Sequence, residues 1–81
     1  MYGEFMLCKR DMMTLAKTGT IKYAEILPSD DGFLLAIYLS DRMKHILHTD
    51  RKKHRTFKSL DAVYSMVLNI GLTEVTLKLK H

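Results

Sequence analysis

Apolar residues recur at the spacing of an amphipathic helix in two segments of the chain. In residues 9–17 they repeat every three or four positions, which predicts a short helix that Thr18-Gly19 ends. Residues 59–70 repeat the pattern, with Ser59 suited to the N-cap and Gly71 to the C-terminal stop. The apolar arc of this second helix exceeds a half-turn. We expect the excess to belong to the core, and a subunit contact is the alternative.

Strand-favouring residues fill most of the chain between these helices. Residues 20–27 and 33–39 flank the turn-forming run Pro28-Ser29-Asp30-Asp31-Gly32, which predicts a β-hairpin. The 33–39 strand is apolar on both faces, so it needs cover on both sides. Only one predicted helix is long enough to cover a sheet face fully, and the N-terminal helix or a second subunit could cover the second face. Residues 43–49 and 55–57 bracket a polar group at 50–54 and predict a second hairpin. A helix there is the alternative, which the β-branched residues and the lack of a wide apolar stripe disfavour.

The last segment, residues 74–80, alternates apolar and polar positions as a half-buried strand does. Its lysines suit an exposed edge that must avoid unwanted pairing. The predicted order is α-β-β-β-β-α-β. It indicates an α+β fold with a mainly antiparallel sheet of four to five strands, a short N-terminal helix and one main helix, with the helices on one side. A chain of 81 residues leaves room for a single small domain, residues 1–81.

So small a core is only marginally sufficient to hold a fold. Cys8 is the single cysteine, so no internal disulfide supplements the core, and we expect a homo-oligomer. The N-terminal residues lack the pattern of a signal peptide, and the longest apolar run, residues 33–39, is too short to span a membrane. These features predict a soluble cytoplasmic protein with no membrane partner.

Positive charge is concentrated in one segment. The net charge is +4, yet residues 41–58 hold seven cations against two acids (+5), while the remainder holds six cations and seven acids (−1). A localised basic patch suits an anion or nucleic-acid site, and a two-stranded ribbon fits the major groove of duplex DNA. The tyrosines are not interleaved with these cations, so base stacking is not indicated. An acidic protein partner and a merely solvated turn are the alternatives. The predicted nucleic-acid-binding residues are Arg42, Lys44, Arg51, Lys52, Lys53, Arg55 and Lys58.

Residues that could support catalysis or metal binding are sparse. The sequence has no glycine-rich phosphate loop, nucleophile elbow or paired Cys-x-x-Cys. His45 and His48 are three residues apart, so on a strand they point to opposite faces. His54 could face His48 across the hairpin, which gives two ligands where zinc takes three or four. We therefore expect neither an enzyme nor a bound cofactor or metal.

The second predicted hairpin leads directly into the main helix. The block Arg55-Thr56-Phe57-Lys58-Ser59-Leu60-Asp61-Ala62-Val63 is reached there from Leu47-His48-Thr49-Asp50-Arg51. This block resembles an element of small accessory proteins from bacterial plasmids and integrative elements, in particular the partition-associated proteins encoded beside plasmid segregation genes. The resemblance implies a non-enzymatic role in maintaining or regulating a mobile element, through DNA or a DNA-bound protein.

Two functions of different classes therefore stand as hypotheses. The first is an accessory protein, a homodimer, that binds duplex DNA or a DNA-bound partner through Arg51, Lys52, Lys53 and Arg55 of the basic hairpin. The second is a protein-interaction module or inhibitor that acts through the doubly apolar strand or through an edge strand open to β-augmentation. A dimer with both basic hairpins on one face would favour the first, because paired sites match a two-fold axis.

Overall fold

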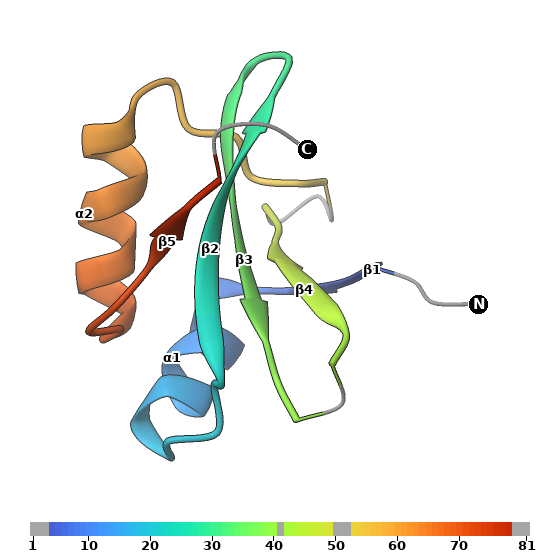
Figure 1. The fold of residues 1–81 in the computed structure, drawn as a ribbon, viewed down its shortest axis with the longest axis vertical. Helices are drawn as coiled ribbons and strands as arrows, with labels where there is room; N and C mark the ends of the chain where they lie inside the picture. The colour runs from blue at the N-terminus through green and yellow to red at the C-terminus, as the bar shows by residue number, and fades with distance from the viewer. Residues whose placement is uncertain (1–3, 41, 50–52, 79–81) are drawn as a thin grey trace.

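The computed structural model describes residues 4–40, 42–49 and 53–78, which form a five-stranded sheet and two helices (Figure 1). Along the chain the elements are β1 (Glu4–Leu7), α1 (Lys9–Lys17), β2 (Tyr23–Ser29), β3 (Gly32–Tyr38), β4 (Lys44–Leu47), α2 (Leu60–Ile70) and β5 (Thr76–Leu77). None of the described helices is long and apolar enough to cross a membrane.

Local sequence signals set the ends of both helices. α1 spans the predicted residues 9–17. α2 begins after Ser59, whose Oγ accepts a hydrogen bond from the Ala62 amide at 3.1 Å. It ends at Gly71, which adopts a left-handed conformation with φ 99°. The predicted N-cap and C-terminal stop are thereby confirmed.

The sheet is mixed, with the strand order β1-β4-β3-β2-β5. β3 pairs antiparallel with both β2 and β4, whereas the outer pairs, β1 with β4 and β2 with β5, are parallel. The α+β class is confirmed. The expected antiparallel character is met only in part: both pairings of the central strand β3 are antiparallel, but each edge strand joins its neighbour in the parallel direction.

The element order, β-α-β-β-β-α-β, differs from the predicted order at two places. β1 was not expected, because its four residues show no clear alternation and pair with β4 far along the chain. The strand expected at residues 55–57 is reduced to isolated bridges, His48 with His54 and Phe33 with Phe57.

Two parallel crossovers determine where the helices lie. α1 connects β1 to β2, and α2 connects β4 to β5; each crossover moves three positions across the sheet in the same direction. The four strands that they join all run the same way. Parallel crossovers are right-handed in about 98% of cases, so two crossovers with the same course place both helices on one face.

The main core lies between these helices and that face of the sheet. Met12 of α1 and Val63 of α2 are fully buried there, together with Leu35 and Ile37 of the central strand β3. Because α1 shares a face with α2, it does not supply the cover that we considered for the second face of β3. The buried members of this cluster are Met12, Ala24, Ile26, Leu35, Ile37, Leu47, Phe57, Val63, Val67, Ile70 and Leu72.

Neither described helix covers the opposite face of the sheet. There Leu27, Ala36 and Ile46 form a second, smaller buried cluster across three strands, with Leu34 packed against it. A second subunit over this face stays a prediction.

Gly32 begins β3 at a point where another part of the chain approaches closely. Phe57, which lies between β4 and α2, exchanges two backbone hydrogen bonds of 2.8 Å with Phe33. A Cβ on Gly32 would overlap the carbonyl oxygen of Phe57. In addition, the φ of Gly32 is 139°, which L-residues rarely adopt. Both observations require glycine at this position.

Replacing Gly32 by alanine is expected to lower the free energy of unfolding by about 2–4 kcal/mol, because the new methyl group displaces Phe57 and the backbone stays strained. Chemical denaturation measures the loss. Gly19→Ala is the control: its Cβ would meet nothing within 4 Å, and only its φ of 73° is strained, so we expect a loss of about 1 kcal/mol. Equal losses in the two variants would contradict the close approach at Gly32.

Candidate nucleic-acid interface

The connection between β4 and α2, residues 48–59, carries most of the predicted cations, and its first part is held to β4. His48 and His54 form an antiparallel bridge, as the sequence suggested. The Thr49 amide donates to the Lys53 carbonyl at 2.7 Å, and the Arg55 amide donates to the Leu47 carbonyl at 2.9 Å. The two sides of the second predicted hairpin therefore pair at residues 47–49 and 53–55. Asp50, Arg51 and Lys52 at its tip lie outside the described residues.

The second part of the connection is held to β3 instead. The register pairs Ala36 with Ile46, so a longer β4 would bring Thr49 opposite Phe33. Phe57 takes that place, pairs with Phe33 and is buried in the main core. The chain from Arg55 to Phe57 thus leaves β4 and follows β3, which is why the second hairpin is shorter than predicted. The connection is anchored at both ends.

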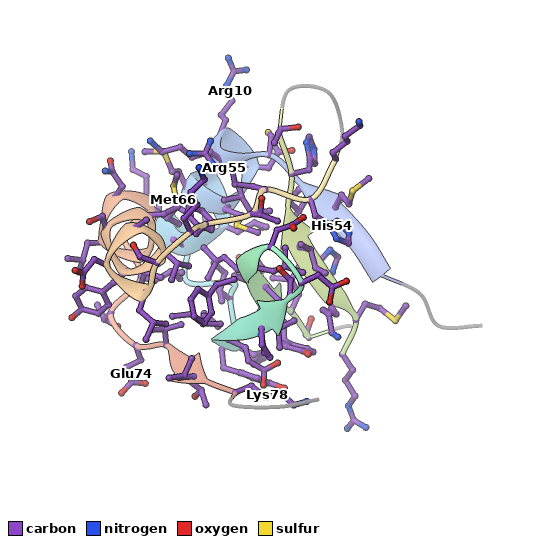
Figure 2. The ribbon with its side chains drawn as sticks, turned by 90° about the horizontal axis from the view of Figure 1, so that it is seen from above. Arg10, His54, Arg55, Met66, Glu74 and Lys78 are labelled. Carbon is purple, nitrogen blue, oxygen red and sulfur yellow. The ribbon has the colours of Figure 1, made fainter. Side chains whose placement is uncertain are left out.

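Three cations of the connection are exposed: Lys53, Arg55 and Lys58. The Arg55 guanidinium carbon lies 5.2 Å from the centre of the Phe57 ring, a cation–π contact that orients the side chain. Figure 2 labels Arg55 and His54 of the connection. Within the part of the chain that the structure describes, none of the three forms an ion pair with a carboxylate. Their charges are therefore available to an anionic partner.

Arg42 and Lys44 lie at the other end of β4. Arg42 is exposed in the turn after β3, with a φ of 63°, and Lys44 is half-buried at the start of β4. Strands rise by about 3.3 Å per residue, so the length of β4 alone separates the two groups by roughly 10 Å. Among the described members of the predicted set, Arg42 and Lys44 therefore stand apart from Lys53, Arg55 and Lys58.

Sequence reasoning missed an aromatic pair beside Arg42. Tyr23 and Tyr38 are opposite each other in the β2–β3 hairpin and stack with their ring centroids 4.4 Å apart. Together with Arg42 they line a hollow of about 510 Å³ on the sheet face that neither helix covers, and Lys22 and Ser40 contribute to the same lining. The pairing could have been predicted from the sequence, because a two-residue turn at Asp30-Asp31 sets the hairpin register that places Tyr23 opposite Tyr38.

Tyr38 is the inner member of this pair. Its hydroxyl donates a hydrogen bond to Oε1 of Glu25 at 3.1 Å. The pKa of Tyr38 is raised from 10.0 to about 12. Burial is the largest cause, followed by the hydrogen bond to Glu25 and the negative charge of that residue. The phenol therefore stays protonated and holds the stacked ring in position.

The connection brings two histidines, His48 and His54, opposite each other. Nδ1 of His48 lies 2.6 Å from the Thr49 carbonyl oxygen, and since a carbonyl can only accept, this nitrogen carries the hydrogen. His45 is buried in β4. No group of three or more His, Cys, Asp or Glu side chains among the described residues is placed to hold a metal ion.

Comparison of the chain with protein-family models, with curated proteins and with solved structures gives no match to any of them. The resemblance to plasmid partition-associated proteins therefore stays a prediction, and the function has to be argued from the site itself.

The raised pKa of Tyr38 predicts a change of stability at high pH. Because the folded-state pKa lies above the unfolded value of 10.0, the contribution of Tyr38 is fully present below pH 10 and is lost as the pH rises through about 12. Tyr38→Phe is expected to remove this loss, measured as the free energy of unfolding at several alkaline pH values. Tyr64→Phe, on the exposed side of α2, is the matched control. An unchanged pH dependence in Tyr38→Phe would contradict the assignment.

Proposed function

We propose that this protein is a non-enzymatic accessory protein that binds the backbone of duplex DNA through the connection between β4 and α2. The observation that carries the proposal is the exposure of Lys53, Arg55 and Lys58, without described carboxylate partners, on a segment anchored at both ends. Arg51 and Lys52 precede them in the sequence and add two charges to the same segment.

The chemistry of these side chains suits phosphate. Each lysine or arginine that neutralises a phosphate releases a condensed counterion, which is the main source of affinity for duplex DNA. Arg55 presents a planar fork of donors, and the exposed hydroxyl of Thr56 next to it can donate a further hydrogen bond. The anchors at His54 and Phe57 fix the backbone between them, so little conformational entropy is lost when these groups bind.

A role in maintaining or regulating a mobile genetic element, inside the cytoplasm, is the biological setting that we propose for this activity. It rests on the resemblance of residues 47–51 and 55–63 to plasmid partition-associated proteins. The described part of that block comprises a β-bridge at His48, an anchoring phenylalanine and a capped helix, which are structural features and not catalytic ones.

The proposal predicts a steep dependence of affinity on salt. With about four phosphate contacts, binding to a short DNA duplex should weaken about 100-fold between 50 and 200 mM salt. Replacing Lys53, Arg55 and Lys58 together by alanine should lower the slope of log affinity against log salt by about 3. Fluorescence anisotropy at several salt concentrations measures both quantities.

The matched control removes Lys9, Arg10 and Lys17, which are also two lysines and one arginine, exposed on α1. It loses the same net charge, so long-range electrostatics are equal in the two triple variants. Equal slopes for both variants, or no binding of the unmodified protein at low salt, would contradict the proposal.

A second candidate activity is the binding of single-stranded nucleic acid at the hollow beside Arg42. Its support is the stacked pair of Tyr23, which is 51% exposed, and Tyr38, next to the cations Lys22 and Arg42. An exposed aromatic face accepts any base, while neighbouring cations hold the backbone.

For this second activity, Tyr23→Ala is expected to weaken binding of a single-stranded oligonucleotide about tenfold, because one stacked base is lost, and to leave duplex binding unchanged. Met13→Ala, which removes a side chain of similar exposure from α1, is the control. If Tyr23→Ala binds the oligonucleotide as tightly as the unmodified protein, the hollow is not the binding site.

The alternative function, a protein-interaction module or inhibitor, stays a prediction. It would need an apolar surface or an open strand edge. Both features occur together at one edge of this molecule, formed by α2 and β5, and that edge fits a more specific partner.

A further inference from the structure

β5 is the last strand at one end of the sheet, and half of its backbone groups face outward. The Lys78 amide donates to the Ile26 carbonyl of β2 at 2.9 Å, so residue 78 and, by alternation, Thr76 direct their backbone groups inward. Val75 and Leu77 consequently direct theirs away from the sheet. No other described strand pairs with this outer edge. A further strand can therefore be added here.

An apolar ridge on α2 lies beside this edge. Leu60, Tyr64 and Leu68 follow one another at four-residue spacing and are 42%, 54% and 59% exposed. The apolar arc of α2 therefore extends beyond the core. Ile70, on one side of the arc, is buried as expected, whereas Leu60, Tyr64 and Leu68, on the other side, are exposed. Leu77 of β5 is also 40% exposed.

The ridge and the strand border the same groove. Tyr64 and Leu68 line it from the helix, and Thr76 of β5 and the preceding Val75 line it from the other side; its volume is about 780 Å³. Figure 1 shows α2 and β5 side by side at this end of the sheet. A partner that adds a strand to β5 would thus also have to supply apolar side chains above the sheet, where the groove lies.

The sequence of the edge is complementary to itself when it is reversed. Glu74-Val75-Thr76-Leu77-Lys78 places an acid and a base at equal distances on either side of Thr76, with one apolar residue between on each side. An antiparallel pairing of two such segments about Thr76 sets Glu74 opposite Lys78 and Val75 opposite Leu77, twice each. Figure 2 shows Glu74 and Lys78 at opposite ends of β5.

We propose that the partner of this edge is a second copy of the same chain, joined by antiparallel pairing of β5 with β5 about a two-fold axis at Thr76. Val75 and Leu77, whose backbone groups face outward, become the hydrogen-bonded pairs, and Glu74 pairs with the partner's Lys78. Because an axis perpendicular to the sheet keeps both α2 helices on the same face, the two ridges meet across it and fill the two grooves. A second copy supplies hydrogen-bond partners for the outward backbone groups, covers the apolar ridge and pairs the charges. In an isologous interface the same surface does this for both subunits.

The dimer also sets the spacing of the two cationic connections. The connection lies beside β3 at Phe57, roughly 17 Å from the axis across the strands and roughly 10 Å along them. The connections of the two subunits are therefore roughly 40 Å apart. One turn of duplex DNA, about 34–36 Å, separates the half-sites of two-fold DNA-binding proteins. The interface itself does not rest on nucleic-acid binding, and its tests contain no nucleic acid.

The oligomeric state of the isolated protein is the first test. Sedimentation equilibrium over a range of concentrations should give a dimer, and Leu68→Glu should weaken the dimer at least about tenfold, because a charge would enter the apolar contact. Ser65→Glu, on the same helix but outside the ridge, should leave it unchanged. Circular dichroism confirms that both variants are folded. A protein that is monomeric at every concentration, or a dimer that Leu68→Glu does not weaken, would overturn the proposal.

The pairing of β5 is the second test. Glu74→Lys should weaken the dimer about tenfold, because two opposite-charge pairs become like-charge pairs, and adding Lys78→Glu should restore it. In a Cys8→Ser background, Thr76→Cys should form an intermolecular disulfide under mild oxidation, since Cα atoms across the axis lie about 4.5 Å apart. Ser65→Cys is the control that should not. A dimer without rescue by the second charge and without the Thr76→Cys crosslink would show that another surface joins the copies.

Discussion

The crossovers β1-α1-β2 and β4-α2-β5 start from strands that point the same way, and each steps three positions in the same direction across the sheet. A common handedness therefore puts α1 and α2 on one face. That single constraint gathers the larger core, from Met12 to Val63 and Leu35, beneath two helices. It also leaves the other face with only the small cluster around Ala36, and it brings β5 to the outside of the sheet beside α2.

The candidate site depends on one place where the regular strand pairing stops, at the end of β4. After Leu47 the chain could have continued along β3, but it turns outward, and Phe57 occupies the position next to Phe33. The exchange is possible because Gly32 has no side chain to meet the Phe57 carbonyl. The segment between Leu47 and α2 consequently forms only isolated bridges, and it carries the exposed Lys53, Arg55 and Lys58. Their arrangement is thus a consequence of packing between Phe57 and β3.

Features whose signals are local could be predicted from the sequence. α1, α2 and both caps of α2 follow from apolar spacing, Ser59 and Gly71, and the first hairpin follows from its turn residues. Features that depend on distant partners could not. β1 is recognisable only beside β4, and the exposed side of the α2 ridge is known only once β5 is placed. The basic segment is continuous in the sequence, yet β4 runs through it and divides it, so Arg42 and Arg55 end at opposite ends of that strand.

Amide chemical-shift mapping with a short DNA duplex at low salt is the most direct test of the proposed nucleic-acid binding at the connection between β4 and α2. We expect the largest shifts on residues 49–58, smaller ones at Ser59 and Leu60 where α2 begins, and none at Tyr64 and Leu68 farther along the helix. Shifts confined to the hollow beside Arg42 or to the α2–β5 edge, or no shifts at all, would contradict it.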